Sequence, residues 1–136
     1  MTHRSLFWLQ LGLALFFLAN GLMAWLKPDE FRELLSTSVF STWLTDPGQL
    51  VWLIRVNDLV LFGLLVSGRW PRVTALWAAG WILGVMSVTG FFSFDAVEHL
   101  GVLALIVAYA TATSVDAAVH QADSPTSAPI EATNRT

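Results

Sequence analysis

The sequence alternates long apolar runs with short polar connectors. The apolar runs cover residues 5–26, 50–68, 72–92 and 96–115. Each run is about 20 residues long, which is the length that an α-helix needs to cross a bilayer core of about 30 Å. We therefore predict an all-α membrane protein, a four-transmembrane-helix bundle that occupies residues 1–115.

The connectors between the runs carry helix and turn signals. After the first run, Pro28 opens a segment with acidic residues in its first turn and apolar residues on one face. This pattern predicts a short amphipathic helix on the membrane surface, through about Leu35. Residues 46–48 (Asp-Pro-Gly) are a turn signal, and residues 69–72 leave room only for a tight reversal.

The two ends of the chain have patterns of their own. From residue 116 onward Ala, Ser, Thr, Pro and Asp dominate, so we predict a disordered tail over 116–136. At the other end, Arg4 before an apolar run also fits a signal peptide. The run at 5–26 is longer than an ordinary signal core, and no clean small-x-small cleavage site follows it. These features favour a transmembrane helix.

The third run contains small residues at helical spacing. Gly80 and Gly84 are four residues apart, as are Ala75 and Ala79. Small residues at this spacing let two helix backbones approach closely. We expect close helix packing here, with chance as the alternative, because Gly and Ala are common in such helices.

Composition strengthens the membrane interpretation and excludes several functions. Hydrophobic residues make up 55% of the 136 residues, and charged residues 12%, about half the usual share in a soluble domain. The net charge of −3 comes without a basic patch, which argues against nucleic-acid binding. The absence of cysteine removes disulfides, thiolate metal sites and thiol redox chemistry. A redox role would need a bound cofactor or a partner protein.

Basic residues predict the orientation in the membrane. Arg4 precedes the first run, and Arg69 and Arg72 fill the tight loop between the second and third runs. Lys27 and Arg32 follow the first run, among four acids that count little in this rule. Because basic loops stay on the cytoplasmic side, we place both termini and the loop at 69–72 in the cytoplasm.

The second run is unusual because it carries Arg55, Asn57 and Asp58 within one turn. A charge near the bilayer centre costs about 2.5–3.5 kcal/mol, whereas each surrounding Leu, Val, Ile or Phe returns only about 0.3–0.6 kcal/mol. This helix therefore needs neighbours that shelter its polar groups. In the predicted orientation the outer half of the bundle collects polar side chains from separate helices: Asn20, Arg55, Asn57, Asp58, Glu98 and His99.

Most of these polar residues have a purely structural alternative. Arg55 is spaced to pair with Asp58 within its helix, or to extend toward the membrane surface. Glu98 fits a helix cap, His99 an interfacial hydrogen bond, and Asn20 a hydrogen bond between helices. Asp58 is the deepest charge, and an ionisable residue at such depth indicates a functional site or an essential polar core.

The candidate chemistry of this polar layer is ligand binding. One histidine with Asp58 and Glu98 is too few ligands for a metal site, and no nucleophile elbow or phosphate-binding loop is present. We therefore assign no catalytic residue. A polar pocket beneath Trp and Phe side chains suits an amphiphile such as a quinone, whose ring carbonyls would accept hydrogen bonds from Arg55 or His99. A proton path through Asp58, Glu98 and His99 is a further alternative.

Several of these features are similar to one known family. They are the Leu/Gly/Ala/Phe-rich segment 11–23 that contains Asn20-Gly21, the Lys-Pro connector with Phe31, Asp58 in a helix with Gly63 and Gly68, Arg72 at the start of the third run, and His99. Over about residues 5–112 the chain resembles the DoxX-like family of small four-span bacterial membrane proteins. Arg55 and Asn57 match nothing in that family pattern.

The resemblance implies a multi-pass protein of the bacterial cytoplasmic membrane that is associated with an oxidoreductase complex. Its partners would be the lipid bilayer and soluble or membrane redox enzyme subunits. Together with the residues, it predicts a subunit that is not catalytic alone and that binds a quinone or similar amphiphile through Asn20, Arg55, Asp58, Glu98 and His99. A structural or assembly protein without a ligand, or a small transporter, is the alternative.

Overall fold

The protein is built from helices throughout its described part. The computed structural model describes residues 3–36, 38, 46–90 and 94–122, and no strand occurs within these ranges. The helices are α1 (His3–Leu26), α2 (Pro28–Ser36), α3 (Pro47–Ser67), α4 (Pro71–Thr89) and α5 (Phe94–Ala122). Four of them, all but α2, are long and apolar enough to cross a membrane, which confirms the predicted fold class.

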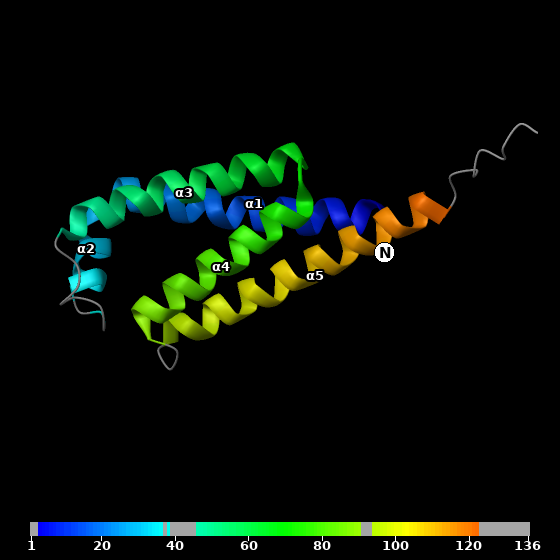
Figure 1. Ribbon diagram of the computed structural model, residues 1–136. Coiled ribbons are helices and arrows are strands. Elements are labelled where there is room, and N and C mark those ends of the chain that lie inside the picture. Colours follow the sequence, from blue (N-terminus) through cyan, green and yellow to red (C-terminus); the bar gives the residue numbers. More distant parts are fainter. Residues whose placement is uncertain (1–2, 37, 39–45, 91–93, 123–136) are drawn as a thin grey trace, which may run out of the picture.

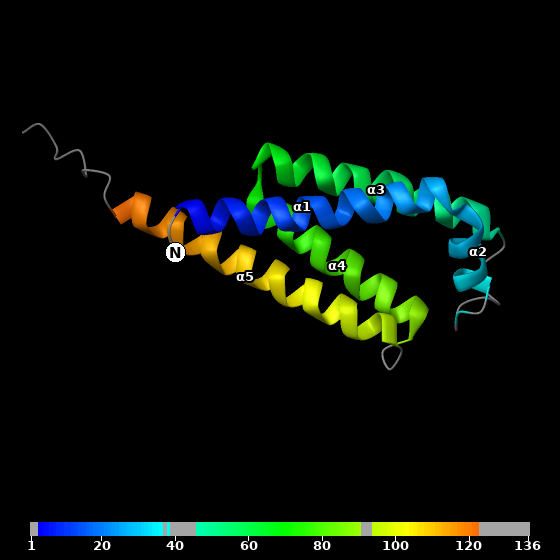
Figure 2. The same cartoon turned by 180° about the vertical axis from the view of Figure 1, so that it is seen from behind.

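The four long helices form an up-and-down bundle. Each runs antiparallel to the one before it, and the order around the bundle is α1, α3, α4, α5 (Figures 1 and 2). The short helix α2 lies at the end where α1 leads into α3. The α4–α5 pair diverges from the α1–α3 pair toward that same end, which we call the α2 end.

Local signals set the helix boundaries close to the predicted positions. The Asp46 side chain accepts a hydrogen bond from the Gly48 amide at 2.8 Å, which caps α3. At the other end, Gly68 has a φ of 61°, and its amide donates to the carbonyl of Leu65. Such a left-handed residue stops a helix, and Pro71 begins α4 in the next turn. The predicted tight reversal is therefore confirmed, whereas Pro47 and Gly48 of the predicted turn belong to the first turn of α3.

Helix α2 is amphipathic as expected. Leu35 is buried and Phe31 is half-buried, whereas the outer side carries two ion pairs, Lys27–Glu30 and Arg32–Asp29, both at 2.8 Å. The apolar face of α2 packs against α3 and Ala24. This helix is thus part of the bundle rather than a separate surface element.

The last helix is longer than predicted. Helix α5 continues to Ala122, so residues 116–122 are helical where we expected the disordered tail to begin. The polar composition of this segment still permits helix because Ala is the best helix former. Residues 123–136, the rest of the predicted tail, lie outside the described residues.

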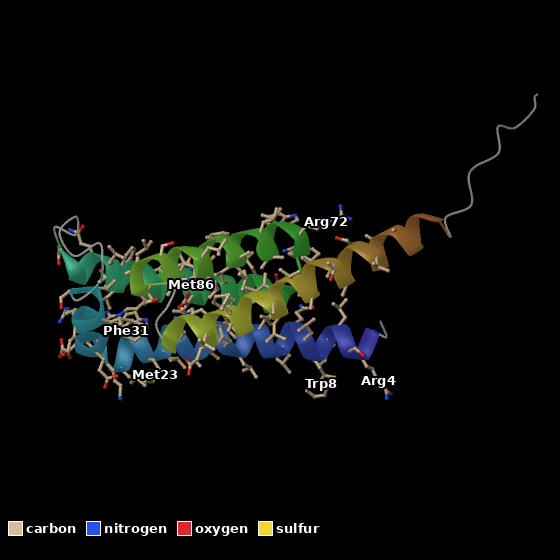
Figure 3. The ribbon with its side chains drawn as sticks, turned by 90° about the horizontal axis from the view of Figure 1, so that it is seen from below. Arg4, Trp8, Met23, Phe31, Arg72 and Met86 are labelled. Carbon is tan, nitrogen blue, oxygen red and sulfur yellow. The ribbon has the colours of Figure 1, made fainter. Side chains whose placement is uncertain are left out.

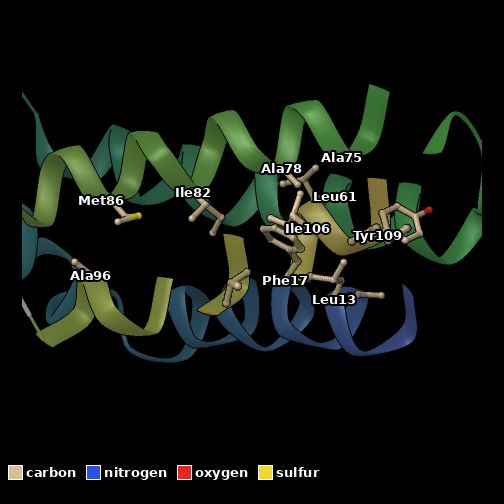
Figure 4. Close-up of a cluster of buried hydrophobic side chains, with 13 residues drawn as sticks. Leu13, Phe17, Leu61, Ala75, Ala78, Ile82, Met86, Ala96, Ile106 and Tyr109 are labelled. Carbon is tan, nitrogen blue, oxygen red and sulfur yellow. The ribbon is translucent and has the colours of Figure 1, made fainter. Parts of the chain in front are cut away.

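The core is apolar and continuous through the middle of the bundle. Phe17 and Leu13 of α1 meet Leu61 of α3 and Ile106 of α5 (Figure 4). Large apolar side chains also cover the outside, and Leu76 is 76% exposed. Arg4 and Trp8 point outward from the beginning of α1 (Figure 3). An apolar exterior on this scale is typical of a surface that faces lipid.

The expected close packing at Gly80 and Gly84 is wrong. A Cβ atom added to either residue meets nothing within 4 Å, because the α4 face that packs inward carries Ala75 and Ala78 instead. The close approach of two helices occurs at Gly21 of α1. A Cβ atom there would lie 3.4 Å from the Cβ atom of Asp58 on α3.

The tight contact at Gly21 leads to a first prediction. Gly21→Leu should lower the free energy of unfolding by about 1–3 kcal/mol, because its side chain has to displace α3. The matched control is Gly12→Leu in the same helix, where nothing lies within 4 Å of an added Cβ atom. Unfolding of both variants in mixed detergent micelles, followed by tryptophan fluorescence, measures the difference. Equal stabilities would contradict the packing at Gly21.

Candidate functional site

The site is centred on Asp58, whose side chain is fully buried on α3. One carboxylate oxygen, Oδ2, accepts a hydrogen bond from the side-chain amide of Asn20 on α1. The other, Oδ1, accepts a longer one of 3.4 Å from Asn57. The Trp81 side chain of α4 interacts favourably with the same carboxylate. Side chains of α1, α3 and α4 therefore stabilise one acidic group, as a charge buried in an apolar interior requires.

A second tryptophan fixes the orientation of the Asn57 amide. The indole Nε1–H of Trp77 donates to Oδ1 of Asn57 at 2.9 Å. Because an indole nitrogen only donates, the amide oxygen of Asn57 faces Trp77 and its nitrogen faces Asp58. The result is a directed chain of hydrogen bonds from α4 through Asn57 to the carboxylate.

Arg55 belongs to a different environment. Its Nε donates to the backbone carbonyl of Ala24 at 2.8 Å, and its guanidinium carbon lies 4.8 Å from the centre of the Trp25 ring. The ion pairs found among the described residues do not include Arg55 with Asp58. The side chain therefore extends toward the C-terminal end of α1, where the helix dipole favours a positive charge. Pairing within the helix, one of the two structural alternatives for Arg55, is thus wrong.

The two predicted site residues of α5, Glu98 and His99, lie in different environments. His99 is half-buried, lies beside the polar layer and interacts electrostatically with Asp58. Glu98 is exposed on the outside of the helix. A helix cap at Glu98 would pair it with Asp95, whose side chain lies outside the described residues. Of the five predicted site residues, the structure thus brings together Asn20, Asp58 and His99, and it directs Arg55 and Glu98 elsewhere.

A cavity of about 400 Å³ opens beside this polar layer, toward the α2 end. Its volume falls in the range of small-molecule sites, about 300–1,000 Å³. The end near Asp58 carries polar groups from Asn20, Trp81 and His99, and Thr89 lies nearer the α2 end. The remaining wall is apolar and comes from α2, α3 and α4: Phe31, Leu34, Leu35, Leu50, Leu53, Ile54, Gly84, Val85 and Val88. Phe31 and Met86 mark this end of the bundle in Figure 3.

Asp58 does not line the cavity itself. The side chain has no exposed surface, and Asn20 stands between it and the cavity. Asp58 is therefore a positioning residue that orients the groups in front of it. Among the described residues that line the cavity there is no Asp, Glu, Lys or Arg, so this part of the wall offers neutral polar groups and one histidine.

Sequence reasoning missed the two tryptophans of α4 and the part that α2 plays. Trp77 and Trp81 are four residues apart, which places them on the same face of a helix. That spacing was a usable signal for a paired role. The contribution of Phe31, Leu34 and Leu35 to the cavity follows from α2 folding back against α3, which the amphipathic pattern alone does not specify.

Comparisons with known proteins give no match from which a function could be taken. No protein-family model, no curated protein and no solved structure matches this chain. Within the described residues, no group of three or more His, Asp or Glu side chains is placed to hold a metal ion. Function is therefore inferred from the cavity and the Asp58 network.

The Asp58 network leads to a second prediction. Asp58→Ala should lower the free energy of unfolding by about 1–3 kcal/mol for each amide that it leaves unpaired. A double-mutant cycle with Asn20→Ala should give a coupling of about 0.5–2 kcal/mol, because the two side chains share one hydrogen bond. Glu98→Ala, an exposed acid, is the control and should change stability little. Additive losses in the cycle would contradict the Asn20–Asp58 contact.

Proposed function

We propose that this protein is a non-catalytic membrane subunit of an oxidoreductase complex that binds a quinone or a related amphiphile between its helices. The observation that carries the proposal is the cavity of about 400 Å³, whose described wall is apolar along α2 and α3 and polar beside Asn20 and His99. A ring with oxygen substituents fits the polar end, and an apolar tail fits the leucine-rich wall. This division matches ligand sites in general, which are mostly apolar with a few placed polar groups.

The chemistry of the wall supports a neutral ligand. Within the described lining residues no side chain carries a fixed charge, so an anionic head group would find no fixed cation among them. The contact between Arg55 and a ring carbonyl, expected from the sequence, is not part of this proposal, because Arg55 is engaged with Ala24 and Trp25. Asn20, Trp81 and His99 are the residues that meet the head group.

The redox part of the proposal rests on the resemblance to DoxX-like proteins and on what the chain lacks. The sequence has no cysteine, so electrons would enter and leave through a bound ligand and a partner subunit. We place the protein in the bacterial cytoplasmic membrane, with both termini in the cytoplasm. The distribution of Arg4, Arg69 and Arg72 supports that orientation.

A structural role is the second candidate, and one observation favours it. Asp58 is fully buried and its donors come from neighbouring helices, so the same network would also fix helix packing. A purely structural protein would keep this network and bind no ligand. Ligand binding therefore separates the two candidates.

The third prediction concerns the cavity. Decyl-substituted benzoquinone should raise the thermal unfolding temperature of the purified protein, since a ligand at 100 times its Kd stabilises the folded state by about 2.7 kcal/mol. Gly84→Trp, which places an indole in the cavity, should abolish the increase. Gly80→Trp lies one turn earlier on the same helix, outside the cavity, and should retain it.

Two outcomes of this experiment would go against the ligand proposal. One is a wild-type protein that shows no increase at saturating quinone, which would leave the structural role. The other is an equal loss of the increase in both glycine variants, which would place binding somewhere other than the cavity.

The fourth prediction concerns orientation. The chain has no cysteine, so single cysteines report on one position each. Gln49→Cys, at the beginning of α3, should react with a membrane-impermeant maleimide added to intact spheroplasts. Ser67→Cys, at the end of α3, should react only after the membrane is permeabilised. The reverse pattern would overturn the proposed orientation.

A further inference from the structure

The direction of each hydrogen bond around Asp58 determines what the cavity offers to a ligand. Trp77 donates to Asn57, and Asn57 in turn donates to the carboxylate. The Trp81 side chain also interacts with Asp58. The donors of Trp77 and Asn57 are thus engaged in a chain that ends at the buried acid.

Asn20 is the group that connects the acid to the cavity. Its side-chain nitrogen, Nδ2, donates to Asp58, and Asn20 also lines the cavity. An amide has its donor and its acceptor on opposite branches. With the nitrogen turned to Asp58, the oxygen, Oδ1, is the branch that remains for the cavity.

Thr89 adds a second acceptor to the cavity, nearer the α2 end, because it is the last residue of α4. Its hydroxyl donates to the backbone carbonyl of Val85 at 3.2 Å, which leaves the oxygen lone pairs available. The cavity therefore has acceptors from two helices, and His99 is a further polar group in its wall. One N–H of Asn20 and the hydroxyl of Thr89 donate within the protein.

We propose that this cavity selects ligands whose head group carries a hydroxyl donor, such as hydroquinones and long-chain phenols, over quinones and ethers of the same shape. The inference rests on the proposed function of the cavity and names its ligand class. The ligand hydroxyl donates to Oδ1 of Asn20, and Asn20 donates to Asp58. Such a chain is reinforced by the charge at its end, because hydrogen bonds in series polarise one another.

The expected selectivity follows from the cost of an unpaired acceptor. A site that is built to accept from a hydroxyl group rejects an analogue without one, because the buried acceptor then loses its partner. Asp58 acts in this scheme as a positioning residue. Its carboxylate holds the Asn20 nitrogen, and this fixes which branch of the amide the ligand meets.

The test compares 4-nonylphenol with 4-nonylanisole, its methyl ether. The two molecules share ring and tail, and they differ in the hydroxyl donor. Quenching of tryptophan fluorescence in lipid nanodiscs, with Trp81 in the cavity wall, gives the Kd of each. We expect the phenol to bind about 10-fold more tightly than the ether. Decyl-hydroquinone should likewise bind more tightly than decyl-benzoquinone.

Variants assign the preference to Asn20. Asn20→Leu keeps the approximate volume of the side chain, and it should reduce the ratio of the two Kd values to about one. Gln10→Leu is the matched control. Gln10 is another amide of α1 and bonds the Leu65 carbonyl, but it lies outside this cavity, so the ratio should stay as in the wild type. If Asn20→Leu fails to fold, the Kd ratios of the two ligand pairs on the wild-type protein still test the hydroxyl preference.

The outcomes separate this inference from the proposed function. Equal Kd values for phenol and ether, or tighter binding of the ether, would overturn the hydroxyl preference and leave an amphiphile site in place. Binding of none of the four ligands would overturn the proposed function as well. A preference for the phenol that persists in a folded Asn20→Leu protein would overturn the role of Asn20.

Discussion

The structure depends on one contact, the hydrogen bond between the Asn20 amide of α1 and the Asp58 carboxylate of α3. A carboxylate inside an apolar bundle is stable only when neighbouring groups satisfy it. Gly21, next to Asn20, lets α1 approach α3 closely enough for this contact. The need to satisfy Asp58 also orients Asn57, which turns its amide nitrogen toward the same acid, and Trp81 of α4 interacts with this acid as well.

The same constraint connects packing to function. Asn20 donates to Asp58 and also lines the cavity, so the branch of its amide that remains for the cavity is an acceptor. The α4–α5 pair diverges from the α1–α3 pair at the α2 end, and the cavity opens there with α2 along one wall. One buried acid thereby holds α1 and α3 together, and it also determines which polar atom of Asn20 faces the cavity.

The sequence predicted the elements well and the relative rotation of the helices poorly. Four long apolar runs specify four membrane helices, and Asp58 was identified because its insertion cost is high. Helices that are apolar on every side, however, carry little information about which side faces the bundle. For this reason we expected Arg55 and Glu98 in the polar layer, where neither side chain lies. We also expected a close helix contact at Gly80 and Gly84, whereas the close contact is at Gly21. Side-chain length mattered as well, because Arg55 reaches the end of α1 from within α3.

The most direct test of the account follows the side-chain amide of Asn20 by NMR. The chain has three asparagines, Asn20, Asn57 and Asn134, so protein labelled with ¹⁵N-asparagine in nanodiscs gives three side-chain amide signals that single substitutions assign. Addition of 4-nonylphenol should shift the Asn20 signal most, the Asn57 signal less, through Asp58, and the Asn134 signal not at all. A saturating ligand that leaves the Asn20 signal unmoved would contradict the claim that Asp58 presents this amide to the cavity.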